Sequence, residues 1–316
     1  MTTSAPDRFL LEHAPAAPRS LDPALVSARD SLRAALAELR TVRDDALERR
    51  WPWRGDAADV RYGFYRQYEE LEGARAAAGR ALVTARESDT PARPLVAAAT
   101  AARWDLHGLL AGLADDDLDR DPGNGEWSLR QTLAHIVNVQ RAYGCYTAWW
   151  HSRRDAAADD FPAHVPDDAV PGFPEEEADG VGTLADVQRR LDDVLDLSAA
   201  VFAGLNDDEL AVRARWAGFA VDVRFRVTRW SSHLREHTLQ VEKTLTMIGR
   251  PTSEVDRLLR LVAAGYGRLE EELFMSPADE AAVAAASQRA QEAAAAVATQ
   301  AREIRAAAEV PATGEG

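Results

Sequence analysis

The chain has almost no cysteine and almost no lysine, and each shortage narrows its chemistry. Cys145 is the single cysteine among 316 residues, which excludes an intrachain disulfide and any zinc site built on several thiolates. A metal, if bound, must therefore use histidine and carboxylate ligands. Lys243 is the only lysine and the other 36 basic residues are arginine. In an alanine-rich chain this bias indicates high-GC coding more than a phosphate-binding role.

Long apolar runs and targeting segments are also missing. No stretch reaches the roughly 20 uninterrupted apolar residues that would span a bilayer. The first eleven residues include Asp7 and Arg8, so they resemble neither a signal peptide nor a transit peptide. A cytoplasmic location is expected. The formal net charge of -15 opposes nucleic acid and anionic membranes as partners, because both are polyanions.

Several common catalytic motifs are absent as well. The sequence has no Gly-rich phosphate loop, no recognisable Ser/His/Asp arrangement and no H-E-x-x-H segment. These absences remove several classes of nucleotide-binding and hydrolytic enzyme. We also find no internal repeat along the chain.

Apolar residues recur at helical spacing through most of the chain, which predicts an all-α fold. Ser128 followed by Gln131 forms a capping-box pattern before one helix. The segment 219–227 fits a strand as well as the opening of a helix, and we favour a helix from about 223. The last helix is mostly Ala, Glu, Gln and Arg, so we expect it to bury little and to lie on the surface or fray. The predicted helices are 22–49, 58–86, 96–113, 129–153, 183–205, 223–249, 251–275 and 277–309.

Three histidines stand out in this helical pattern. His233 and His237 are four residues apart, which places them about 40° apart around a helix with Cβ atoms roughly 6 Å apart. Both rings can reach one ion, although the same spacing is common for two histidines on a polar face. His135 lies on the apolar stripe of another helix, where an imidazole without a partner would be costly. A third ligand from that helix would complete a site with an open coordination position.

Two segments around these histidines resemble a known family. Glu126-Trp127-Ser128-Leu129 with Leu133-Ala134-His135-Ile136, and later Trp230 with His233-Leu234-Arg235-Glu236-His237 up to Gly249, are similar to the hallmark segments of the DinB/YfiT-like superfamily. The resemblance covers about residues 95–250. It implies a four-helix bundle in which His135, His233 and His237 bind a divalent ion, zinc or nickel.

The helical pattern and the resemblance together divide the chain into four parts. Composition and periodicity predict a disordered leader (1–19), an N-terminal helical pair with a linker (20–94) and C-terminal helices (251–316), and the resemblance implies the DinB-like four-helix bundle between them (95–250). The acidic loop 155–182 makes the spacing between His135 and the later pair longer than is usual in the family. The helices at both ends are additions to the family pattern.

The function that the resemblance implies is a metal-dependent thiol S-transferase or isomerase. The ion would lower the pKa of a low-molecular-weight thiol, such as mycothiol in a high-GC organism, for reaction with a small electrophile. The alternative is a metal-stabilised helical module that binds a small ligand or a protein partner without turnover. Hydrolysis by metal-bound water is a third interpretation and would need a general base, for which Glu236 is the candidate. A homodimer is compatible with the sequence.

Other side chains receive more ordinary interpretations. Arg229 is a candidate for binding a substrate carboxylate, although the nearby Glu236 and Glu242 favour a surface ion pair. Asn138 and Glu236 are candidates for the oxygens that accept the second ring N–H of a ligand histidine. Cys145 is interpreted as a small core residue. His107 and His151 have no partner at metal spacing.

Overall fold

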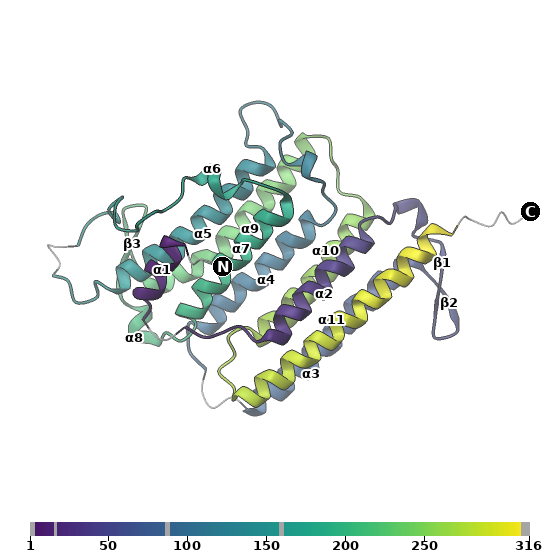
Figure 1. The fold of residues 1–316 in the computed structure, drawn as a ribbon, viewed down its shortest axis with the longest axis horizontal. Coiled ribbons are helices and arrows are strands. Elements are labelled where there is room, and N and C mark those ends of the chain that lie inside the picture. Colours follow the sequence, from purple (N-terminus) through teal and green to yellow (C-terminus); the bar gives the residue numbers. More distant parts are fainter. Residues whose placement is uncertain (1–3, 16–17, 86–88, 158–160, 311–316) are drawn as a thin grey trace, which may run out of the picture. The chain divides into compact units, whose positions relative to one another are not determined.

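The computed structural model describes residues 4–15, 18–85, 89–157 and 161–310, and it confirms a predominantly helical fold (Figure 1). Two short antiparallel hairpins are the β-structure within these residues. The contacts divide the chain into two compact units. Unit 1 comprises residues 1–21, 88–103 and 114–249, and unit 2 comprises residues 22–87, 104–113 and 250–316. The four-part division expected from the sequence stays a prediction.

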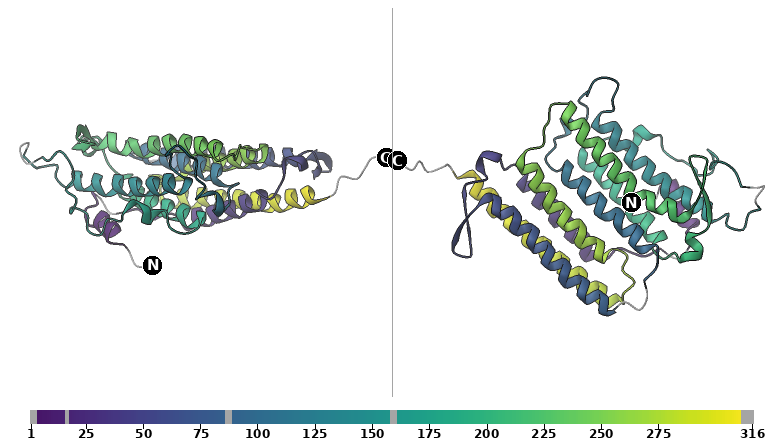
Figure 2. Two further views of the ribbon diagram at one scale, coloured as in Figure 1. Left: turned by 90° about the horizontal axis from the view of Figure 1, so that it is seen from above. Right: turned by 180° about the vertical axis from the view of Figure 1, so that it is seen from behind.

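Unit 1 is built on long helices that run alongside each other (Figure 2). Helix α5 packs against both α7 and α9, and the short helix α1 packs on α5 and α7. Helix α4 (Arg93–Leu110) belongs to unit 1 as far as Arg103 and to unit 2 from Trp104. The other elements of unit 1 are α1 (Ala5–Glu12), η2 (Asp115–Asp117), α5 (Leu129–His151), α6 (Glu176–Asp179), α7 (Leu184–Phe202), α8 (Asp207–Leu210), β3 (Arg213–Trp216), β4 (Phe219–Asp222) and α9 (Val223–Met247).

Unit 2 is a second bundle of four long helices. Helix α11 packs along α2 and α3, and α10 packs along α3 and α2. Its elements are α2 (Pro23–Leu39), η1 (Asp44–Ala46), β1 (Arg50–Trp53), β2 (Asp56–Asp59), α3 (Val60–Ala85), α10 (Glu254–Leu273) and α11 (Glu280–Glu309).

Local sequence signals account for where most helices begin. The predicted capping box is present at α5, where Ser128 accepts a hydrogen bond from the N–H of Gln131 and the Gln131 side chain accepts one from the N–H of Ser128. Thr183 with Asp186 begins α7 in the same way. Each box satisfies backbone donors that a helix start would otherwise leave without partners. The helix boundaries are thus encoded within a few residues.

The ambiguous segment 219–227 contains both a strand and a helix start. Phe219–Asp222 forms β4 and Val223 begins α9, as expected from about 223. The two turn residues, Ala217 and Gly218, have φ angles of 46° and 83°. This left-handed pair matches the twist that a two-residue hairpin requires.

Three expectations about helices were wrong. The leader contains α1, which Ser4 caps and which buries Phe9 and Leu10. The helix predicted to reach 49 ends at Leu39, because Asp44 leaves the helix and caps the start of α10 by accepting bonds from the N–H groups of Glu254 and Val255. Helix α11 is packed in its bundle rather than superficial, since a stripe of small alanines allows close approach to α2 and α3.

No helix among the described residues is both long and apolar enough to cross a membrane.

A buried ion pair in unit 2 gives a stability prediction. The Arg29 guanidinium contacts both Glu270 carboxylate oxygens, at 3.0 and 2.7 Å, and both side chains are buried. Glu270→Ala removes the carboxylate that neutralises the buried Arg29 guanidinium, so we expect a loss of roughly 3 to 5 kcal/mol in the free energy of unfolding. Urea denaturation followed by circular dichroism measures it. Glu38→Ala, which breaks the partly exposed pair with Arg305, should cost about 1 kcal/mol or less; equal losses in the two variants would contradict the prediction.

Candidate metal centre

The three histidines come together where α5 packs against α9. His135 lies on α5, and His233 and His237 lie one turn apart on α9. One ligand nitrogen from each ring can be chosen so that all three lie within 4.8 Å of one another. Nitrogens bound to one tetrahedral zinc ion would be about 3.3 Å apart. Small side-chain rotations therefore suffice to bring the three rings onto one ion.

Two of the rings are oriented by hydrogen bonds from their outer nitrogens. Nδ1 of His135 lies 2.9 Å from Oε2 of Glu176, and Nδ1 of His237 lies 2.7 Å from Oε1 of Gln240. Both partners are oxygen acceptors, so each Nδ1 donates the hydrogen, and Nε2 is the nitrogen with a lone pair when the ring is neutral. This arrangement is typical of metal-ligating histidines, whose second nitrogen donates to a carboxylate or an amide oxygen.

His233 has a buried ring nitrogen that is free to act as a metal ligand. Its Nδ1 is buried and has no hydrogen-bond partner among the described residues. Burial, with the neighbouring His237 and His135, lowers the pKa of His233 to about 2, and burial likewise lowers the pKa of His237. Both rings are therefore neutral near pH 7, which is the form that binds a metal. The residues present fit a divalent cation.

The sequence motif around this site has a match among known families. Residues 98–241, which include all three histidines, match the sequence model of the DinB superfamily. This part of the chain is a DinB domain. The match covers somewhat less than half of the 316 residues. Comparisons with curated proteins and with solved structures returned no match.

The acidic loop supplies a residue to the metal centre of the DinB domain. Glu176, in the short helix α6 of that loop, is the carboxylate that contacts His135. Asn138 and Glu236, the oxygens proposed from the sequence for this role, contact other groups. Asn138 donates to the Pro174 carbonyl and to Asp179, and Glu236 pairs with Arg229. No sequence signal distinguishes Glu176 from its acidic neighbours on either side.

Tyr143 and Trp127 lie against the histidines, and Tyr143 connects Arg229 and Trp216 to them. The Tyr143 ring lies edge-on to His233, with centroids 5.6 Å apart, and the half-exposed Trp127 lies 5.1 Å from His135. The Tyr143 hydroxyl accepts hydrogen bonds from Nε of Arg229 and from Nε1 of Trp216, each at 3.3 Å. A cationic and a phenolic group therefore lie beside the centre.

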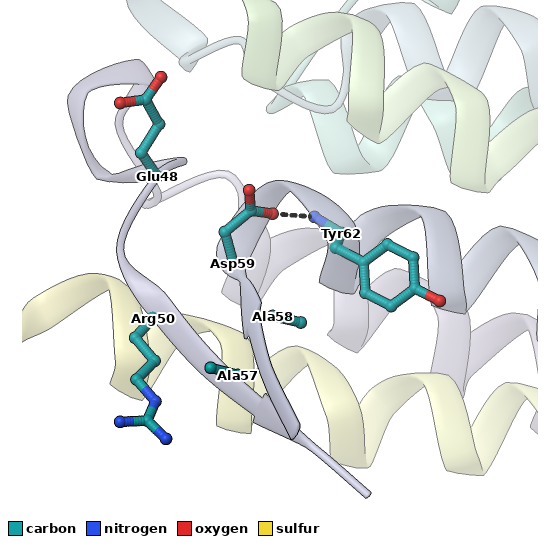
Figure 3. Close-up of a pocket in the computed structure, with 6 residues that line it drawn as sticks. All are labelled: Glu48, Arg50, Ala57, Ala58, Asp59 and Tyr62. Carbon is teal, nitrogen blue, oxygen red and sulfur yellow. Dashed lines mark hydrogen bonds between the residues drawn. The ribbon is translucent and has the colours of Figure 1, made fainter. Parts of the chain in front are cut away.

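Other candidate groups are placed away from such chemistry. Cys145 is buried, and burial raises the pKa of its thiol to about 12, which fits a core residue rather than a nucleophile. Among the described residues, the three histidines are the cluster suited to hold a metal. An open hollow of about 640 Å³ borders the hairpin of unit 2 (Figure 3), but no histidine lines it.

Metal binding tests the three ligands directly. The purified protein should bind about one equivalent of zinc or nickel, and His135→Ala and His237→Ala should each abolish tight binding while helix content is retained. Elemental analysis and isothermal titration calorimetry measure this. His164→Ala, which removes an exposed histidine, is the matched control and should bind as the parent does. Unchanged affinity in both ligand variants would refute the assignment.

Glu176 gives a separate prediction, because it orients a ligand without touching the ion. Glu176→Gln should lower zinc affinity by about 10- to 100-fold through loss of the acceptor for Nδ1–H of His135. Competition titration with a chelator measures the change. The neighbouring variants Glu175→Gln and Glu177→Gln remove the same charge from the same loop and should bind within about twofold of the parent. A similar loss in all three variants would indicate a general effect of charge.

Proposed function

We propose that the DinB domain is a metal-dependent S-transferase or isomerase that acts with a low-molecular-weight thiol. The observation that supports it is a cluster of three histidines, two of them buried and with lowered pKa values, beside Arg229 and Tyr143. Three protein ligands leave a fourth coordination position for an exogenous group. When bound, a divalent cation lowers the pKa of a coordinated thiol and so makes the thiolate available at neutral pH.

The protein side chains provide the surroundings that such a reaction needs. Arg229 holds Glu236 at 2.9 Å and lies over the Trp216 ring, so its guanidinium is already oriented. Because Glu236 is exposed, a substrate carboxylate can replace it on Arg229 without uncovering a buried charge. Tyr143, held by Arg229 and Trp216, is placed to hydrogen-bond to a group that adds to the thiol.

The finer identities are part of the same proposal. An all-histidine donor set suits zinc and nickel alike, so either ion fits. The arginine-rich composition indicates a high-GC organism, and this favours mycothiol as the thiol. A single buried cysteine favours a reducing cytoplasm. A small electrophile would be the second substrate. Nucleic acid and membranes are not expected as partners, and a homodimer is compatible with this assignment.

A second candidate function rests on where the ligands lie. Because His135 comes from α5 while the other two come from α9, a bound ion would join two helices of one bundle. Such an ion stabilises the folded state by binding it in preference to the unfolded chain. This supports the alternative of a metal-stabilised module without turnover. Hydrolysis is less favoured, since the Glu236 carboxylate pairs with Arg229 at 2.9 Å rather than with a ligand histidine.

Thiol-transfer assays separate the two functions. Mycothiol, bacillithiol and glutathione are each offered with a model electrophile that carries a carboxylate, using protein with and without its metal. We expect a metal-dependent rate with one thiol, and kcat/KM lowered about tenfold or more in Arg229→Ala through loss of a charged hydrogen bond. Arg235→Ala, an exposed arginine on the same helix, should leave the rate unchanged. No metal-dependent rate with any thiol would favour the module.

A further inference from the structure

The two β-hairpins are the same structure at two places in the chain. In the first, Arg50 pairs with Asp59, and in the second Arg213 pairs with Asp222, so the registers agree after a shift of 163 residues. Both turns use two left-handed residues that end in glycine, at Gly55 and Gly218. A long helix begins directly after the second strand of each hairpin, α3 at Val60 and α9 at Val223.

The amino-acid sequences agree at the same shift. Residues 44–66 and 207–229 share eleven identical residues without a gap. A two-residue turn explains one glycine, but it does not explain identities that continue into the helix. The shared residues are Asp44/Asp207, Asp45/Asp208, Leu47/Leu210, Arg50/Arg213, Trp53/Trp216, Gly55/Gly218, Ala57/Ala220, Asp59/Asp222, Val60/Val223, Arg61/Arg224 and Arg66/Arg229.

Side-chain contacts repeat as well. Asp59 caps α3 by accepting a bond of 2.7 Å from the N–H of Tyr62 (Figure 3), and Asp222 caps α9 by accepting one of 2.7 Å from the N–H of Phe225. An edge-to-face ring pair follows in each unit, Trp53 with Tyr62 and Trp216 with Phe225, both with centroids 5.6 Å apart. An arginine then lies over each tryptophan, Arg66 at 4.8 Å and Arg229 at 5.3 Å.

The buried faces of the flanking helices match. All seven buried residues of α3 correspond, at the shift of 163, to buried residues of α9. Six of the seven buried residues of α2 correspond, at the same shift, to buried residues of α7. One of these pairs is charged: Arg29 is buried against Glu270, and its equivalent Asp192 is buried 3.5 Å from Arg103. The charges are exchanged but the buried ion pair is retained.

Helix α11 corresponds to α5 with a shift of 157 residues. Eight of its nine buried residues then fall on buried residues of α5. The polar link to the neighbouring helix is also kept in reciprocal form. In unit 1 the side chain of Gln140 on α5 donates to the carbonyl of Trp230 on α9. In unit 2 the direction is reversed. The side chain of Gln67 on α3, the equivalent of Trp230, donates to the carbonyl of Val297 on α11, the equivalent of Gln140. The eight pairs are Ala286/Leu129, Ala290/Leu133, Ala293/Ile136, Ala294/Val137, Val297/Gln140, Ala301/Gly144, Ile304/Thr147 and Ala308/His151.

We propose that unit 2 is a second DinB-type bundle, produced by tandem duplication, whose metal site has been lost. In chain order, α2, β1–β2, α3, α4 and α5 form one copy, and α7, β3–β4, α9, α10 and α11 form the other. Unit 1 takes α5 from the first copy and α7 and α9 from the second, whereas unit 2 takes α2 and α3 from the first and α10 and α11 from the second.

The ligand positions of unit 2 follow from the same shifts. His233 and His237 correspond to Glu70 and Ala74 on α3, and His135 corresponds to Glu292 on α11. Alanine has no donor atom, and the two glutamates are not among the described residues that cluster as ligands. Unit 1 thus holds the metal centre, with ligands from both copies, and unit 2 is a bundle of the same design without histidines at the ligand positions.

Restoring the ligands tests this proposal. The variant Glu70→His/Ala74→His/Glu292→His should bind about two equivalents of zinc where the parent binds about one. The control Glu69→His/Gly73→His/Glu292→His keeps the helical spacing but turns the pair by about 100°. The control should bind its second zinc at least about tenfold more weakly than the triple variant. Misplacing ligands should reduce metal affinity at least as much as losing a hydrogen bond to one ligand does. Calorimetry with zinc alone measures both, and circular dichroism reports folding.

The outcomes separate this proposal from the native site. A folded triple variant that binds no more zinc than the parent, or no more tightly than its control, overturns the proposal. If the parent binds none but the triple variant binds about one equivalent, the duplication stands and the native site falls. If the triple variant does not fold, Glu70→His/Ala74→His keeps the Glu292 carboxylate as third ligand and is compared with Glu69→His/Gly73→His. Equal zinc affinity in these two would also overturn it.

Discussion

The packing of α5 against α9 is the contact on which the metal centre depends. It brings His135 to the pair His233 and His237 and removes all three rings from bulk water to different degrees. Burial penalises the charged imidazolium, which lowers the pKa of His233 and of His237 and keeps their nitrogens available to a cation. The same burial leaves Nδ1 of His233 without a hydrogen-bond partner among the described residues, a cost that coordination of that nitrogen would offset.

Residues outside the two helices orient the ligands and define the surroundings. Glu176 reaches His135 from the acidic loop, so that loop takes part in the centre rather than merely joining two helices. The hairpin β3–β4 contributes Trp216, which supports Arg229 and Tyr143 beside the histidines. The loop therefore orients one ligand histidine, and the hairpin supports the arginine and tyrosine beside the metal centre.

The duplication explains why two bundles of similar construction have different chemistry. The hairpin, its capping aspartate and the tryptophan–arginine contact are retained in both, because they determine how α3 and α9 begin. The ligand positions carry no such structural duty, since Glu70 and Ala74 do not contribute to the seven buried positions of α3. Function at these positions could be lost without loss of the fold.

The sequence by itself determined most helices, the capping box at Ser128 and the three histidines, because helical spacing and caps are local properties. It did not show that α11 is packed, since small alanines bury well only against a partner that approaches closely. Nor did it show that Glu176 contacts His135, because one carboxylate in an acidic run is chosen by the path of the loop. The repeat is also not evident in the sequence, since its identities are confined to a short segment and each bundle combines helices distant in sequence. Tertiary contacts decided these points because they join residues that no local pattern relates.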